Sequence, residues 1–151
     1  MLGYVEADIE SSMAWLTVLQ LHHLYLNHEN FDAVARRLYV DPSTTNSAVR
    51  SVLAAQLQQA ARDELLRSSS YIDVSALEAE AAEAFEALST LLGDKTYFFD
   101  RQKPGLFDAS VFAYTHLIMD QKMGWKYNRL EQLLSQHRNL VQHRERLLEF
   151  F

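Results

Sequence analysis

The sequence predicts an all-α domain of about six to seven helices with no sheet. Only four glycines and two prolines interrupt the 151 residues. Apolar residues recur at intervals of three and four rather than two, which is the spacing of amphipathic helices. A content of 48% hydrophobic and 23% charged residues is that of an ordinary globular domain with a continuous core. Because we find no internal repeat and no linker, we expect residues 1–151 to form one domain.

The first half of the chain predicts three helices. A long helix over residues 5–27 carries a broad apolar stripe, which suggests burial on two sides. Asn30 can cap a short second helix, which ends at Asp41-Pro42. A third helix runs over residues 44–68, with capping oxygens in its first three residues. The residues expected to face the core are Phe31, Val34, Ala35 and Leu38 in the second helix, and Val49, Val52, Leu53, Leu57, Ala60 and Leu65 in the third.

The second half predicts four more helices. The first begins with a capping box, in which Glu78 can accept a hydrogen bond from the Ser75 amide, and it ends at Gly93. Its core edge is formed by Leu77, Ala81, Phe85, Leu88 and Leu92. The other three cover residues 105–121, 126–136 and 139–151. Asn139 and Gln142 form a second cap-like pair at the start of the last helix.

Asp108 is a single carboxylate near the front of a very apolar segment, residues 105–121. The composition of this segment is that of a helix surrounded by other helices, so we expect its first backbone amides to be buried. If Gly105 is the cap residue, the Asp108 carboxylate can accept from the Gly105 amide and lies at the positive end of the helix dipole. We favour this structural role over that of a catalytic acid, because no nearby residue supplies an obvious partner.

Charge and cysteine content exclude several classes of function. The 14 Lys and Arg residues against 20 Asp and Glu give a net charge of −6, which argues against sequence-independent binding to nucleic acid. With no cysteine, the chain has no disulfide, thiol nucleophile or thiolate metal site, and it suits a reducing compartment. Residues 1–8 do not resemble a secretory signal or a mitochondrial presequence. The most apolar run, residues 109–119, is too short to cross a bilayer, so any membrane association is expected to be peripheral.

Several segments together resemble a known family. They are YFF at residues 97–99, Pro104, FDASVFAY at residues 107–114, RNLVQHRER at residues 138–146 and FDAVARRLY at residues 31–39. In order and spacing they are similar to the helical C-terminal half of glutathione-transferase-like proteins, and among these to the metaxins. In that superfamily a central helix begins with Ser/Thr-x-x-Asp. Here Gly105 replaces the Ser or Thr, and Arg138 stands where many relatives have proline.

The resemblance implies a function that composition alone does not give. Metaxins are non-enzymatic peripheral subunits of the sorting and assembly machinery on the cytosolic face of the mitochondrial outer membrane, where they aid insertion of β-barrel proteins. The implied partners are a membrane-embedded β-barrel assembly protein and a sister metaxin-like subunit. Family members also carry a thioredoxin-like half before the helical half, which we do not recognise in these residues. Two alternatives stay open: the helical half of a glutathione-dependent transferase, and a transferase-like scaffold in a translation complex.

The sequence offers no pattern for a catalytic, cofactor or metal site. His22 and His23 are neighbours on a helix and point about 100° apart, so they cannot chelate one ion together. No Gly-x-Ser-x-Gly elbow and no phosphate-binding glycine loop is present. The aromatic residues between 97 and 114 are interpreted as core, with a ligand pocket as the alternative. We therefore expect no catalytic residue, cofactor or metal.

The last helix is the most cationic part of this acidic chain. Arg138, His143, Arg144 and Arg146 form a candidate basic contact face. We interpret these side chains first as a solvated surface near the carboxyl end of a helix. The alternative is a contact with anionic lipid head groups or with an acidic partner protein.

Overall fold

The computed structural model describes residues 18–67 and 70–150, and every regular element within these ranges is a helix. The predicted all-α fold is confirmed. In chain order the elements are η1 (His22–Leu26), α2 (His28–Asn30), η2 (Phe31–Val40), α3 (Ser47–Leu65), α4 (Val74–Leu92), η3 (Phe98–Asp100), α5 (Leu106–Met119), η4 (Gln121–Met123), α6 (Arg129–Leu134) and α7 (Arg138–Leu148). Elements η1 and η2 are π-helical, whereas η3 and η4 are single 3₁₀ turns.

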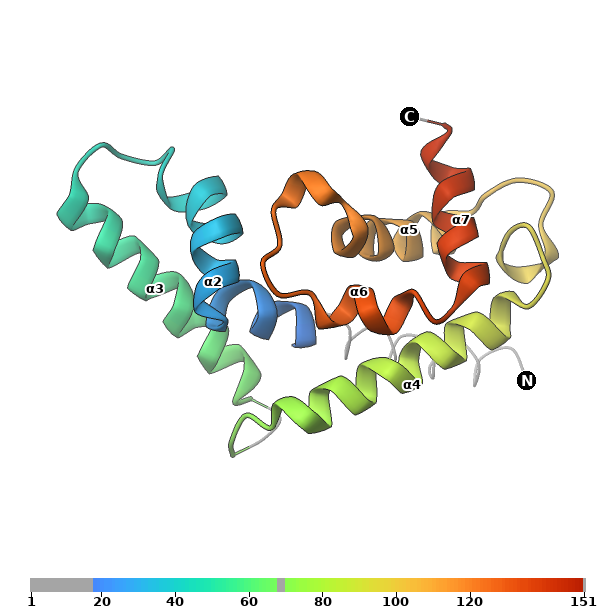
Figure 1. Ribbon diagram of the computed structural model, residues 1–151, viewed down its shortest axis with the longest axis horizontal. Coiled ribbons are helices and arrows are strands. Elements are labelled where there is room, and N and C mark those ends of the chain that lie inside the picture. Colours follow the sequence, from blue (N-terminus) through green and yellow to red (C-terminus); the bar gives the residue numbers. More distant parts are fainter. Residues whose placement is uncertain (1–17, 68–69, 151) are drawn as a thin grey trace.

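The helices form two packed groups. Helix α3 packs on η1 and η2, while α4 packs on α6 and α7, and α5 packs on the same two helices. Figure 1 shows α3 at the left edge, the long α4 along the lower edge, and α5, α6 and α7 above α4. The segment between α5 and α6 reaches back to the first group, where the Arg37 guanidinium donates to the carbonyl of Met123 at 2.9 Å. None of the described helices combines the length and the apolar content needed to cross a membrane.

The main core lies between α4 and the helices that follow it. The stripe predicted for α4 is confirmed, because Ala81, Phe85, Leu88 and Leu92 are buried and Leu77 is half-buried. The core cluster consists of Leu19, Ala81, Ala84, Phe85, Leu88, Leu92, Phe98, Val111, Ile118, Leu130, Leu133, Leu134 and Leu140. The intervals of three and four along α4 therefore place one side of this helix against three others.

In the second half of the chain, two of the predicted helix caps are wrong. Helix α4 begins one residue earlier than predicted, and the Asp73 carboxylate, not Ser75, accepts from the amide of Ala76 at 3.1 Å. Helix α7 begins after His137, so Asn139 lies inside its first turn. Asp, Asn and Ser are all good cap residues, and the sequence alone does not rank neighbouring candidates. The predicted stop at Gly93 is confirmed as a positive-φ cap (φ +55°) that accepts no L side chain without strain.

The first half contains one correct and one wrong cap. Asn46 caps α3 by accepting from the amides of Ala48 and Val49. Asn30 does not cap the second helix, because Asn27 does so by accepting from the Asn30 amide at 3.1 Å. Of the predicted first helix, residues 5–17 lie outside the described residues. Its described end passes from α-helix to the π-helix η1.

The apolar stripe predicted to bury α3 is largely uncovered. Val49 and Val52 are 44% and 56% exposed, and Leu65 alone of the six predicted residues is buried. In η2, Phe31, Val34 and Ala35 are buried as predicted, whereas Leu38 is 42% exposed. The helical period is real, but within the described residues nothing covers the first half of this stripe.

Helix α5 is not surrounded on every side, so that prediction is wrong. Its buried stripe contains Asp108, Val111, Thr115 and Ile118. The opposite side carries Leu106, Ala109 and Ala113, which are exposed. Helix α5 is therefore apolar on two sides, of which one is buried and the other is exposed.

Candidate functional site

Asp108 is the centre of a buried polar cluster at the start of α5. Its side chain is 1% exposed, and Oδ2 accepts from the amide of Gly105 at 2.8 Å, as expected for a cap. Oδ1 accepts from the amide of Phe98 at 3.0 Å and lies 2.8 Å from Nε2 of His143. Three donors therefore converge on one carboxylate, and the structure supplies the partner that sequence reasoning did not find.

The chemistry of Asp108 fixes the tautomer of His143. A carboxylate only accepts hydrogen bonds, so Nε2 of His143 carries the proton and donates it. Burial lowers the pKa of His143, an effect opposed by the hydrogen bond and the charge of Asp108 and reinforced by Arg146. His143 is thus a neutral donor near neutral pH. Its Nδ1 is buried without a hydrogen-bond partner.

The predicted basic contact face on α7 does not form one surface. His143 is fully buried, so its inclusion was wrong. Arg144 and Arg146 lie about 200° apart around the helix because Arg146 is two positions after Arg144, at about 100° per position. The Arg144 guanidinium contacts Nδ1 of His116 at 3.3 Å, whereas that of Arg146 donates to the carbonyl of Thr96 at 3.0 Å. Only Arg138 has a largely exposed side chain.

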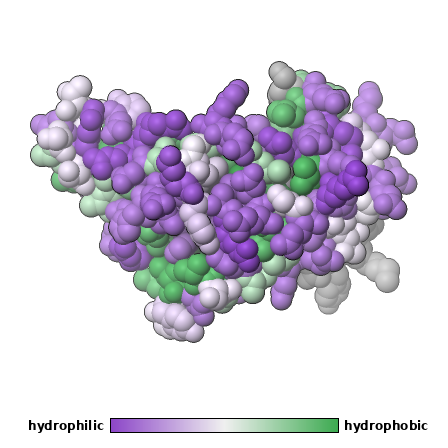
Figure 2. Space-filling view, in the orientation of Figure 1, coloured by the Kyte–Doolittle hydropathy of each residue, from purple (hydrophilic) through white to green (hydrophobic). Residues whose placement is uncertain are grey.

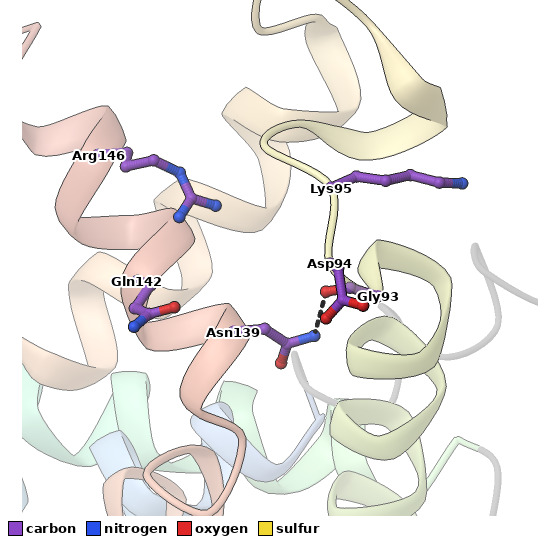
Figure 3. Close-up of a pocket in the computed structure, with 6 residues that line it drawn as sticks. All are labelled: Gly93, Asp94, Lys95, Asn139, Gln142 and Arg146. Atoms are coloured by element: carbon purple, nitrogen blue, oxygen red, sulfur yellow. Dashed lines mark hydrogen bonds between the residues drawn. The ribbon is translucent and has the colours of Figure 1, made fainter.

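A small polar cavity of about 150 Å³ lies between α7 and the end of α4 (Figure 3). It is lined by Gly93, Asp94, Lys95, Asn139, Gln142 and Arg146. Asn139 donates to the carbonyls of Ser89 and Gly93 at 2.8 and 3.1 Å and accepts from the Ser89 hydroxyl at 2.7 Å. The cavity is smaller than the roughly 300–1,000 Å³ of a typical ligand pocket. Asn139 therefore joins α7 to α4, whereas the sequence predicted it only as a helix cap.

Asn30 is a second buried polar residue whose role the sequence did not indicate. Its side chain is fully buried. Oδ1 accepts from the amides of Lys126 and Tyr127 at 2.9 and 3.0 Å, and Nδ2 donates to the carbonyl of Tyr127 at 2.6 Å. This one amide group therefore joins the first group of helices to the segment that precedes α6.

Polar atoms in and just before the π-helix η1 are buried without a hydrogen-bond partner. His23 is 2% exposed and neither of its ring nitrogens is bonded; Nε2 of Gln20 is also buried and unbonded. Burial, together with the charge of neighbouring His22, lowers the pKa of His23 to about 4. The ring contacts Tyr127, with centroids 5.5 Å apart. Across residues 18–67 and 70–150, no group of three or more His, Asp or Glu side chains is arranged to hold a metal ion.

An exposed apolar surface lies at the end of η2 and the beginning of α3. We call it the α3 outer face and define it by Leu38, Tyr39, Val49 and Val52, which are 42%, 52%, 44% and 56% exposed. It lies on the helix group farthest from α7 (Figure 1). In the view of Figure 2 most of the molecule is hydrophilic, and a further hydrophobic area lies where the end of α3 meets the beginning of α4.

One family model matches the second half of this helical fold, which contains the α5 cap. Residues 81–147 match the family described as Glutathione S-transferase, C-terminal domain. The match begins in the second turn of α4 and ends next to the last residue of α7, so it contains the Asp108 cluster and its His143 partner. No curated protein matches this chain.

Proposed function

We propose that this protein is a non-enzymatic, metaxin-like binding subunit of the sorting and assembly machinery on the cytosolic face of the mitochondrial outer membrane. It aids β-barrel insertion by holding partner proteins on a rigid helical surface. The partners are a membrane-embedded β-barrel assembly protein and a sister metaxin-like subunit. The resemblance of residues 97–114 and 138–146 to metaxins supports this role, and both segments lie in or beside the Asp108 cluster.

The observation that carries a binding role is the α3 outer face. Its valines lie three residues apart, a spacing that normally buries a helix side, yet both are about half exposed. An exposed patch of large apolar side chains on a soluble surface is characteristic of a protein-binding site. A partner that covers it would bury the stripe that this part of the chain leaves open.

The buried polar groups of α5 support the same proposal. A catalytic acid must exchange a proton with a substrate within hydrogen-bond reach. Asp108 is 1% exposed and already accepts from three donors, two of them backbone amides. Its geometry suits a rigid framework for binding and leaves the carboxylate no free side toward solvent.

The proposal is tested by purification of the tagged full-length protein from mitochondria solubilised in mild detergent. We expect an outer-membrane β-barrel assembly component to co-purify. Val52→Asp should remove most of this component, because it places a charge in the contact. Ala87→Asp adds the same charge to an exposed position of α4 and should leave the complex intact.

Three results would contradict the proposal. Retention on immobilised glutathione with conjugating activity would instead identify the helical half of a transferase. Co-purification of translation factors or synthetases would identify a scaffold in that process. Equal recovery of the barrel component with Val52→Asp and Ala87→Asp would exclude the α3 outer face as the contact.

A further inference from the structure

The second uncovered apolar surface lies on α5, away from the α3 outer face. We call it the α5 outer face and define it by Leu106, Ala109 and Ala113. At about 100° per residue these three positions fall within about 60° of one another, opposite the buried stripe. Leu106 is 84% exposed, the largest exposed fraction among the exposed large hydrophobic residues of the described chain. Asp108 is the only Asp, Glu, Lys or Arg in α5, and it points to the buried side.

The turn before α5 extends this apolar surface. Phe99 has φ +59°, an uncommon conformation for an aromatic residue. This turn directs Phe98 into the core, where it is fully buried, and leaves Phe99 39% exposed. The rings of Phe99 and Phe107 lie 5.3 Å apart, which holds Phe99 beside the first turn of α5. Large apolar side chains therefore protrude at the amino end of the α5 outer face.

Cationic side chains flank the α5 outer face at both ends. Arg101 and Lys103 are exposed in the loop that leads into α5, and the Arg101 guanidinium lies against Gly105. Farther along α5, His116 lies about 20° from Ala109 around the helix, and its ring contacts the partly buried Arg144 guanidinium. Asp100 is the one acidic residue in the segment 99–106, which thus has two cations against one anion in a chain of net charge −6.

We infer that the α5 outer face and the loop 99–106 form a contact surface for a membrane with anionic lipids. Leu106 and Phe99 enter the interfacial region of the bilayer, while Arg101, Lys103 and Arg144 contact acidic head groups. The chemistry is that of interfacial helices, which combine a few large apolar side chains with flanking basic residues. This contact is separate from the α3 outer face and does not depend on a role in β-barrel assembly.

The size of the surface favours lipid over a protein partner. A stable protein interface buries about 800 Å² on each side. Apart from Leu106, the α5 outer face consists of Ala109 and Ala113, whose small side chains offer little area for such an interface. Weak, reversible attachment to a bilayer needs only a few inserted side chains and a favourable charge.

The test is co-sedimentation of the full-length protein with vesicles of phosphatidylcholine alone or with about 30% phosphatidylserine. We expect the protein to sediment with the anionic vesicles and only weakly with the neutral ones. Leu106→Ser should weaken binding to the anionic vesicles about tenfold, because it removes the more exposed of the two inserted side chains. Lys103→Glu should weaken it by a similar factor, about tenfold, and should have little effect on the weak binding to neutral vesicles.

Matched controls separate this contact from general charge and from folding. Lys126→Glu makes the same charge change at an exposed position in the loop before α6, and we expect unchanged binding. Leu66→Ser makes the same substitution at an exposed leucine after α3 that belongs to neither outer face, and it should also bind as the wild type does. Circular dichroism of each variant establishes that the helical fold is intact.

The inference is overturned if the wild-type protein does not sediment with anionic vesicles, or if Leu106→Ser and Lys103→Glu bind as tightly as their controls. If vesicle binding is absent and Leu106→Ser instead removes a co-purifying protein, the surface binds protein rather than lipid. Loss of the barrel component with Val52→Asp, together with normal vesicle binding, would show that the two surfaces act separately.

Discussion

Asp108→Asn tests the central structural claim with the smallest change. The substitution keeps the shape of the side chain and replaces one acceptor oxygen with an NH₂ group. With the amide oxygen in place of Oδ1, the donors from Phe98 and His143 keep their partner. The Gly105 amide then faces an NH₂ group instead of Oδ2, which now accepts from it at 2.8 Å.

The expected cost follows from that one orphaned donor. A buried donor without a partner costs about 1–3 kcal/mol, so the free energy of unfolding should fall by about that amount. Asp108→Ala leaves three donors unpaired, and the same rule gives about 3–9 kcal/mol. This is comparable with the roughly 5–15 kcal/mol that stabilises a whole domain, so we expect Asp108→Ala to be marginally folded at best and Asp108→Asn to remain measurable.

The assay is urea unfolding followed by circular dichroism, with Asp73→Asn as the matched control. Asp73 is an exposed cap of α4, and Asn caps a helix about as well as Asp. The control should therefore change the free energy of unfolding by less than about 0.5 kcal/mol. If Asp108→Asn lowers the free energy of unfolding no more than Asp73→Asn does, the Asp108 carboxylate does not stabilise the protein as a buried cap.

A double-mutant cycle then isolates the contact between Asp108 and His143. His143→Phe keeps a ring against Phe98, whose centroid lies 5.2 Å from that of His143, and removes the donor to Oδ1. Because Asp108→Asn leaves His143 a neutral acceptor in place of a charged one, the coupling in this cycle measures the charge-assisted part of the bond, about 1 kcal/mol. Strictly additive effects of Asp108→Asn and His143→Phe would contradict a direct bond between the two side chains.

Three further predictions concern other buried polar groups. The pKa of His23 falls from 6.5 to about 4 on folding, so between these values the unfolded chain binds more protons than the folded one. The free energy of unfolding should therefore drop by about 2 kcal/mol as the pH falls from about 7 to about 5. Above about pH 6.5 the titration of His23 no longer lowers the free energy of unfolding. His23→Phe should remove this residue's part of the dependence of the free energy of unfolding on pH. Asn30→Ala unpairs two part-buried backbone amides and a carbonyl and should cost about 2–4 kcal/mol. Asn139→Ala separates α7 from the end of α4 and should cost about 2 kcal/mol.

Each of these three has its own comparison in chemical unfolding. For the pH series, equal slopes for the wild type and His23→Phe would show that His23 does not titrate as a buried group. Asn46→Ala removes an exposed cap and should cost about 1 kcal/mol, so Asn30→Ala must exceed it. Gln142→Ala changes an exposed residue of the same cavity as Asn139, and a loss equal to that of Asn139→Ala would contradict a specific tether.

Local sequence patterns correctly predicted several features that depend on neighbouring residues. Helical spacing identified the core side of α4, and the interval from Gly105 to Asp108 identified a half capping box. These predictions succeed because helix periodicity and capping act within about four residues, and their geometry is the same in any fold. Where two good caps stood close together, as at Asp73 and Ser75, the local signal did not choose between them.

Which distant groups meet, and which apolar sides stay exposed, depends on how the helices pack. The Asp108–His143 bond spans 35 positions, and that from Asn30 to the carbonyl of Tyr127 spans 97. Such pairs depend on how whole helices pack, which no local pattern encodes. The same holds for the α3 and α5 outer faces, because the spacing of Val49, Val52 and Leu106 marks an apolar side but not whether another helix covers it.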